Sequence, residues 1–244
     1  GFASGWRAFL EAGQTMPLAA HFLLAALCAI IFIPAASIGL SASGALAPIS
    51  VSLFIGAFAF GIGMQLANGC GSGVLFTFGG GSGRMLVVLP FFVIGSVLGS
   101  LVLPSVLAWG QLAPVQIGGS FSPLVRTLLN VGLLAGVSLL FWLYGQRHDQ
   151  TSPRRLIIAS VAIAALCWAV FIASGHPWGV TFGFTLWGAK LASAMGFDIA
   201  SYTFWQWPGP ARALAHSVLA DTSSLMDIGI LIGAGLWAAF TGVL

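Results

Sequence analysis

Charged residues are scarce in this sequence. Of 244 residues, eight are Lys or Arg and five are Asp or Glu, so charged residues make up 5% of the chain and the net charge is +3. A soluble domain carries about 25% charged residues, which excludes a surface built to face water on all sides. The basic residues are also too few and too scattered to bind nucleic acid phosphates. We therefore predict a protein outside the soluble class, with no nucleic acid partner.

Cysteines and catalytic motifs are scarce as well. The three cysteines, Cys28, Cys70 and Cys167, show neither CxxC pairing nor metal-ligand spacing. The sequence has no HExxH motif and no Ser-His-Asp order, and the glycine run at 79–83 lacks the Gly-Lys-Ser/Thr ending of a phosphate loop. We predict no enzyme, no metal site and no cofactor. Because Cys28 and Cys167 lie inside apolar runs, we interpret them as packing residues.

Apolar residues, by contrast, make up 59% of the chain, alongside 33 glycines and nine tryptophans. Apolar runs of about 18 or more residues are typical of helices that cross a bilayer. We therefore predict an all-α, polytopic protein that uses the lipid bilayer as its solvent. The region 178–195 is interrupted by glycines and is predicted to form a half-helix or interfacial helix, with a connector at 197–211. The predicted spans are 16–40, 49–67, 85–109, 124–144, 156–174 and 224–242.

A dense cluster of glycines interrupts the chain after the second predicted span, with nine of them between residues 61 and 83. Irregular backbone at membrane depth is tolerated where it lines a cavity or is buried in protein, so we predict a broken or re-entrant helix here. A half-helix that starts near Gly71 would direct free N–H groups at an anion and favour the thiolate form of Cys70. The candidate anion-binding residues are Gly69, Cys70, Gly71, Ser72 and Gly73.

The same residues have a second interpretation that the sequence leaves open. Glycines in membrane helices commonly allow close packing, and a single cysteine commonly acts as a small inert hydrophobe. Two acids near the last span are also ambiguous. Asp221 precedes Thr222-Ser223-Ser224, and we favour a helix cap over a transport role. For Asp227, inside the span, anchoring and transport both remain open.

Weak internal similarity indicates two related halves. Residues 1–7 resemble 183–190, and Ala20-His21 resembles Ala215-His216. Many transporters are built from two such halves. We predict a pseudo-twofold inverted repeat, with a first repeat at 1–150 and the start of a second at 151–244. The sequence begins without Met and ends in an apolar run, so we expect a longer natural chain with a second Gly-Cys segment after Leu244.

Residues 61–73, read as GIGMQLANGCGSG and followed by the glycine–serine turn and Arg84, resemble the YeeE/YedE membrane proteins. Residues 187–192 and 221–229 resemble the second half of that family. The resemblance implies a multi-pass protein of the bacterial inner membrane that takes up thiosulfate, with links to selenium metabolism in some members. It also implies an hourglass-shaped fold in which Cys70 is the central cysteine of a relay. Ala3 departs from the family, which often has Gly-Phe-Cys at this place.

These observations lead to one functional hypothesis and two rivals. The first is a transporter of thiosulfate or a related small sulfur-containing anion, with passive or ion-coupled movement and a cytosolic sulfur-carrier protein as receiver. The second is a membrane sulfur- or selenium-trafficking partner that docks a soluble sulfurtransferase. The third is a structural subunit in which the glycines only pack helices.

Overall fold

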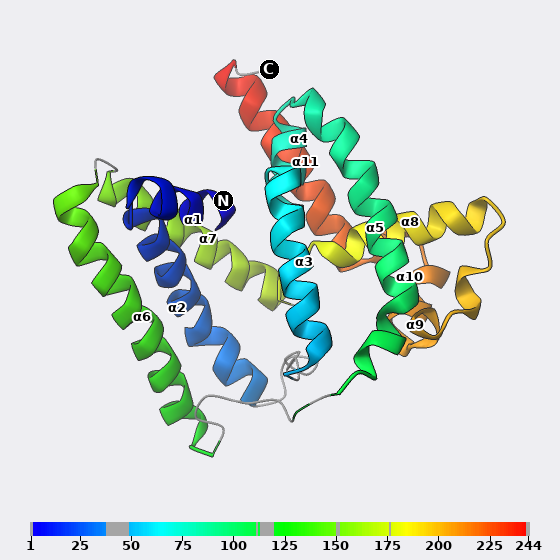
Figure 1. Cartoon of the computed structure of the whole chain (residues 1–244), viewed down its shortest axis with the longest axis horizontal. Helices are drawn as coiled ribbons and strands as arrows, with labels where there is room; N and C mark the ends of the chain where they lie inside the picture. Colours follow the sequence, from blue (N-terminus) through cyan, green and yellow to red (C-terminus); the bar gives the residue numbers. More distant parts are fainter. Residues whose placement is uncertain are drawn as a thin grey trace. The chain divides into compact units, whose positions relative to one another are not determined.

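The computed structural model describes residues 2–37, 49–110, 112, 120–149, 152–175 and 177–242, and these residues form helices, turns and irregular segments (Figure 1). Within these described residues, six helical segments are long and apolar enough to cross a membrane, and each overlaps one of the six predicted spans. The polytopic, all-helical part of the prediction is therefore confirmed. The spanning segments are 16–37, 51–79, 83–107, 123–145, 153–174 and 222–241.

The chain divides into two compact units, and each is discontinuous in sequence. The first combines residues 1–49 with 113–178, and the second combines 50–112 with 179–244. The predicted repeats at 1–150 and 151–244 concern symmetry rather than compactness, and they stay a prediction.

The first unit is built around α2 (Met16–Ser37). Its 22 residues extend about 33 Å at 1.5 Å per residue, enough for a hydrocarbon core of about 30 Å. α2 packs against α6 (Pro123–His148) and α7 (Pro153–Ser174) (Figure 1). Two serines fasten it: Ser138 Oγ donates to the Ala19 carbonyl at 2.8 Å, and Ser160 Oγ donates to the Ala20 carbonyl at 3.1 Å.

A further helix in this unit, α1 (Phe2–Ala12), lies outside every predicted span. It has 11 residues, too few to cross a bilayer, and it packs against α2. The sequence carries a weak signal for it, because Arg7 and Glu11 stand at i and i+4 and form an exposed ion pair at 3.8 Å. Residues 38–48, which include the end of the first predicted span, lie outside the described residues.

The second unit holds the glycine cluster. Here α5 (Gly83–Leu107) packs against α8 (Thr181–Ala194), and α4 (Gly71–Gly79) packs against both α5 and α11 (Thr222–Thr241). Its core contains Leu186, Ala189, Ile199 and Trp205, and the Trp205 indole N–H donates to Ser100 Oγ at 3.2 Å. The helices of this unit are α3 (Val51–Ala67), α4 (Gly71–Gly79), α5 (Gly83–Leu107), α8 (Thr181–Ala194), α9 (Thr203–Gln206), α10 (Pro208–Ala215), α11 (Thr222–Thr241) and two 3₁₀ helices at Ile199–Ser201 and Val218–Ala220.

The region 197–211, predicted as a connector, contains more regular structure than expected. α9 lies within it, and α10 begins in it with Pro208 at the first helical position after Trp207. Proline is common at that position because its fixed φ suits a helix start and its missing N–H would have no intrahelical partner. The Pro208-Gly-Pro210 sequence was thus a helix-start signal as well as a turn signal.

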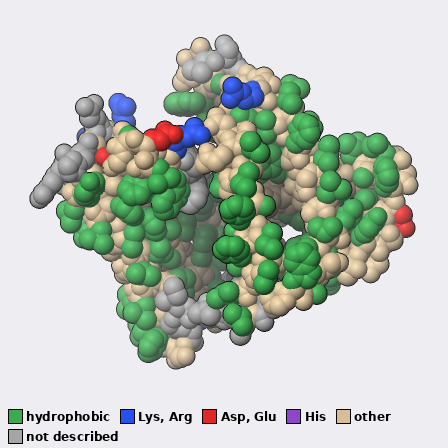
Figure 2. All heavy atoms as spheres, in the orientation of Figure 1, with side chains coloured by type: hydrophobic (Ala, Val, Ile, Leu, Met, Phe, Trp, Pro, Cys, Tyr) green, Lys and Arg blue, Asp and Glu red, His purple; other side chains and the backbone are tan. Residues whose placement is uncertain are grey.

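Many large apolar side chains in both units are exposed, as Figure 2 shows on the visible face. α3 has no buried residue at all. In water such a surface would aggregate, whereas in a bilayer acyl chains solvate it. The exposed apolar surface therefore fits a membrane protein.

Candidate functional site

The segment between α3 and α4 is a sharp break in the helical backbone. α3 ends at Ala67, and Asn68 takes the left-handed conformation with φ of 56°, while the Gly69 N–H bonds the Met64 carbonyl at 3.0 Å. Asparagine tolerates this conformation better than most residues, which explains the helix end. Among the described residues Asn68 is the one non-glycine with positive φ. The chain leaves the helix at the predicted place.

α4 then begins at Gly71, where the sequence predicted a helix start. Cys70 is its N-cap, with extended backbone angles of φ −81° and ψ 175°. The first intrahelical bond runs from the Val74 N–H to the Cys70 carbonyl at 2.8 Å. The N–H groups of residues 71–73 precede that bond and have no carbonyl one turn back within the helix. They therefore give the start of α4 a partial positive charge.

The Cys70 thiol lies over this first turn. Its Sγ is 3.3 Å from Ser72 Oγ, and it is 3.7 Å from the position that a Cβ on Gly73 would occupy. The residue is half-buried, so part of it remains accessible. Sulfur, hydroxyl and backbone donors therefore share one helix end, as the sequence predicted from their spacing. Whether they bind a ligand remains a prediction for Gly69, Cys70, Gly71, Ser72 and Gly73.

Glycines of this region differ in what surrounds them. A Cβ on Gly71 would lie 3.2 Å from the Phe184 ring, and one on Gly79 would lie 2.7 Å from the Leu231 carbonyl. Both glycines therefore permit close helix packing, in agreement with the packing interpretation. Gly69 and Gly73 meet nothing closer than 3.7 Å. Packing does not require glycine at these two positions. A role in leaving space for a ligand is therefore compatible with them.

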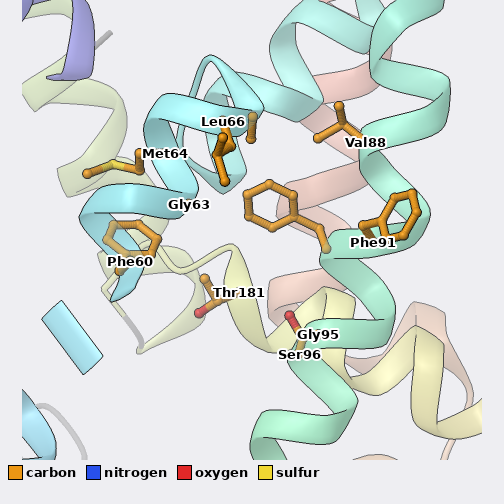
Figure 3. A pocket seen from close by; sticks show the side chains of 11 residues that line it. Phe60, Gly63, Met64, Leu66, Val88, Phe91, Gly95, Ser96 and Thr181 are labelled. Carbon is orange, nitrogen blue, oxygen red and sulfur yellow. The ribbon is translucent and has the colours of Figure 1, made fainter. Parts of the chain in front are cut away.

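Beside the start of α4 lies an apolar pocket of about 590 Å³ between α3 and α5 (Figure 3). Phe60 and Met64 of α3 line one side, and Phe91 of α5 lines another. Thr181, at the start of α8, also lines it, and its Cγ2 is 3.9 Å from the Cβ position of Gly71. An apolar lining offers an anion few donors. The donors of this region instead belong to the first turn of α4.

The part that α8 plays here could not be predicted from the sequence. Phe184 is fully buried, and together with Val180 and Thr181 it closes one side of Gly71. These residues lie more than 100 positions away in the sequence, and their apolar or neutral character does not distinguish them from other span residues. Only the packing of α8 in the second unit places them beside the candidate site.

The two acids of the last span have different environments. The Asp221 carboxylate accepts the Ser224 N–H at 2.8 Å and caps α11, which confirms the cap interpretation. Asp227 is fully buried, and neither of its carboxyl oxygens has a hydrogen-bond partner among the described residues. It therefore does not anchor the end of the helix through a hydrogen bond.

The other two cysteines lie in the first unit. Cys28 on α2 and Cys167 on α7 are free, half-buried and close enough for their thiols to interact. Their place at a helix–helix contact fits the packing interpretation, although the sequence did not predict that they meet. Within the described residues no cluster of three or more His, Cys, Asp or Glu is arranged to hold a metal ion.

Comparison with known proteins agrees with the resemblance seen at residues 61–73. The chain is 27% identical over 207 residues to a protein of Spirochaeta thermophila named thiosulfate transporter TsuA. The alignment covers 79% of this chain and 57% of that relative's length. A family model described as sulphur transport matches residues 1–244, the whole of the sequence. The chain, with its six candidate spans and its cysteine at the start of α4, therefore belongs to the sulphur transport family, the YeeE/YedE proteins.

Proposed function

We propose that this protein takes up thiosulfate, or a related small sulfur-containing anion, across the bacterial inner membrane. Cys70 contacts the sulfur of the substrate, backbone N–H groups of residues 71–73 bind its oxygens, and Gly69 leaves room beside them. The observation that carries the proposal is the position of Cys70, a half-buried residue, as N-cap of a helix inside a spanning segment. The family description and the name of the Spirochaeta relative support the choice of substrate.

The chemistry of the helix start suits such a substrate. Thiosulfate carries negatively charged oxygens, which free N–H donors and the helix dipole attract. It also carries a terminal sulfur that accepts a weak hydrogen bond from a thiol. Cys70 and the first turn of α4 offer both kinds of contact within one turn of backbone. Gly69 and Gly73 leave room for the substrate to approach the backbone, because no neighbour fills the space of their missing side chains.

Uptake of radiolabelled thiosulfate tests this function in bacterial cells that lack their own thiosulfate importers. We expect the parent chain to restore uptake and Cys70→Ala to reduce its initial rate about tenfold or more, since a hydrogen bond to a charged group contributes about 1.5–3 kcal/mol. Cys28→Ala is the matched control, because Cys28 is also half-buried but lies in the first unit. Equal uptake by Cys70→Ala and the parent would remove Cys70 from the pathway.

The proposal includes a membrane topology for the glycine cluster. In it the segment 51–79 is re-entrant, so residues just before α3 and just after α4 face the same side of the membrane. Single cysteines at Ile49 and Gly83, in a chain without its native cysteines, test this with an impermeant thiol reagent. Both positions are exposed and lie outside the segment. Labelling of both cysteines from the same side of the membrane supports the re-entrant form. Labelling of the two cysteines from opposite sides would show instead that the segment crosses the membrane once.

Delivery of the substrate is the last part of the proposal. A cytosolic sulfur-carrier protein receives the imported sulfur compound, within a transporter built from two inverted repeats. Copurification of such a carrier with the parent chain supports this step. Flux of thiosulfate into vesicles that contain only the purified chain would separate transport from docking, because a mere docking partner gives none.

A further inference from the structure

Asp227 stands out as an acidic side chain placed deep inside a spanning helix. It lies in α11, which is one of the six candidate spans, and its exposed fraction is 0%. Neither Oδ1 nor Oδ2 has a hydrogen-bond partner among the described residues. A buried ionised carboxylate without a partner is strongly unfavourable, and acids at membrane depth commonly mark ion or proton pathways.

The carboxyl group points at α8. Oδ2 of Asp227 occupies the space where a side chain of residue 183 would begin, and Cγ is 3.1 Å from the same point. Gly183 makes this approach possible, because glycine is the one amino acid without a Cβ. The carboxyl is thus enclosed between two helices of the second unit, and a change in its charge would act directly on the contact between α8 and α11.

Within the described part of the chain, the elements that pack most closely against α11 are α4, α8 and the 3₁₀ helix Val218–Ala220, and their one basic residue is Lys190. α4 carries no titratable residue, and the same holds for the 3₁₀ helix Val218–Ala220. On α8 the one charged residue is Lys190, whose Nζ donates to the carbonyls of Leu214 at 2.8 Å and His216 at 2.6 Å. The nearest acid on α11 is its cap, Asp221.

Polar groups lead from this carboxyl toward the start of α11. Ser224 lies one turn before Asp227, is fully buried and accepts the Trp187 indole N–H at 3.0 Å. Asp221 lies one turn before Ser224 and is only half-buried. The three side chains follow a spacing of three residues, which keeps them on neighbouring parts of one helix face. Ser224 and Asp221 therefore lie between the buried carboxyl and the end of the spanning segment, with no hydrogen bond to Asp227 itself.

We propose that Asp227 is the proton-binding residue that couples uptake of the anion to entry of protons. The inference rests on the proposed transport function. In one state the carboxyl holds its proton and is neutral, which permits the close contact with Gly183. When the proton leaves for the cytosol, the O–H bond breaks and its electron pair stays on the carboxylate. The charged group then needs water, which separates α8 from α11.

The chemistry around the carboxyl favours a proton over a metal cation. Sodium and other hard cations need several oxygen ligands, whereas here the carboxyl faces a glycine and no cluster of three or more His, Cys, Asp or Glu surrounds it within the described part of the chain. Proton coupling also suits the cargo, because a dianion moves against an inside-negative potential when it enters a bacterium. Protons that enter with it offset this charge.

The test uses the purified full chain in proteoliposomes, with the membrane potential clamped and an inward proton gradient imposed. Radiolabelled thiosulfate reports substrate, and a pH dye inside the vesicles reports protons. We expect the parent to accumulate thiosulfate with internal acidification. Asp227→Asn keeps the size of the side chain. In this variant the accumulation of thiosulfate driven by the proton gradient should fall about tenfold or more, while exchange of thiosulfate without a gradient persists. Asp198→Asn is the matched control at an exposed acid.

Infrared spectroscopy of the same vesicles separates this inference from the proposed function. A neutral carboxylic acid gives a carbonyl band that an ionised carboxylate lacks. We expect this band in the parent and in Asp198→Asn at neutral pH, and its loss in Asp227→Asn. An unchanged band in Asp227→Asn, gradient-driven accumulation equal to the parent, or a requirement for sodium would overturn the role of Asp227. A parent that shows the band but moves no thiosulfate would instead overturn the proposed substrate.

Discussion

Oδ2 of Asp227 on α11 occupies the space that a Cβ on Gly183 of α8 would need. The contact joins the only buried acid with two unpartnered oxygens, among the described residues, to a glycine with no spare volume. The backbone carbonyl carbon of Ser223 lies 3.5 Å from the same point, so the carboxyl has little room to move in that direction.

We therefore expect Gly183→Ala to destabilise the fold. An added methyl in a filled site costs about 1–3 kcal/mol, and this should lower the melting temperature measured in detergent. Gly229→Ala is the control, because a Cβ on Gly229 meets nothing within 4 Å. Asp227→Ala should relieve part of the clash, so the double variant should be less unstable than the sum of the single variants. Equal melting temperatures for Gly183→Ala and Gly229→Ala would contradict this packing.

The cap of α11 gives a second prediction. Asp221 accepts the Ser224 N–H, and loss of such a cap costs about 0.5–2 kcal/mol. Asp221→Ala should show this loss in thermal unfolding. Asp221→Asn should unfold almost like the parent, because asparagine caps a helix about as well as aspartate. If both variants lose the same stability, the negative charge and not the hydrogen bond is what matters at this position.

The first turn of α4 gives a third prediction, through two alanine substitutions. Gly71→Ala places a methyl 3.2 Å from the fully buried Phe184 ring, so it should lower stability. Gly73→Ala meets only the Cys70 sulfur at 3.7 Å, an ordinary contact, so its melting temperature should match that of the parent. Its thiosulfate uptake should nevertheless fall, because the methyl crowds the space beside the thiol. Full uptake by Gly73→Ala would mean that substrate does not approach this backbone.

Thiol reactivity gives a fourth prediction. The three cysteines are all half-buried, so exposure alone does not distinguish them. Cys70, at a helix N-terminus, should react faster with a membrane-permeant alkylating reagent than Cys28 or Cys167, and thiosulfate should slow its reaction. Mass spectrometry of each cysteine after timed alkylation measures the three rates together. Equal rates, or no protection by thiosulfate, would favour the packing interpretation of Cys70.

Local features of this protein could be predicted well. The six spans follow from the length of apolar chain that a bilayer requires, so composition along the chain is enough to find them. The helix end at Asn68, the start of α4 at Gly71 and the cap at Asp221 follow from residues within a few positions of each break. α10 could also have been found, from Pro208 at its first position.

Features that depend on distant contacts could not be predicted in this way. The sequence does not distinguish the glycines of the cluster from one another. In the structure, however, Gly71 and Gly79 face close neighbours whereas Gly69 and Gly73 do not. Likewise, nothing near Cys28 indicates that its helix brings it to Cys167. Apolar spans look similar to one another, so the sequence does not say which helices pack together.

By itself, the sequence determined that this chain is a membrane protein, where its long apolar spans lie, and that Cys70 stands at a break in the helical backbone. These outcomes depend on local conformation and on the lack of charge, both of which can be read residue by residue. The tertiary structure alone decided that α8 encloses Gly71, and that Asp227 is buried against Gly183 without a partner. Burial and hydrogen bonding of a side chain depend on what another helix places beside it, and that is a property of packing.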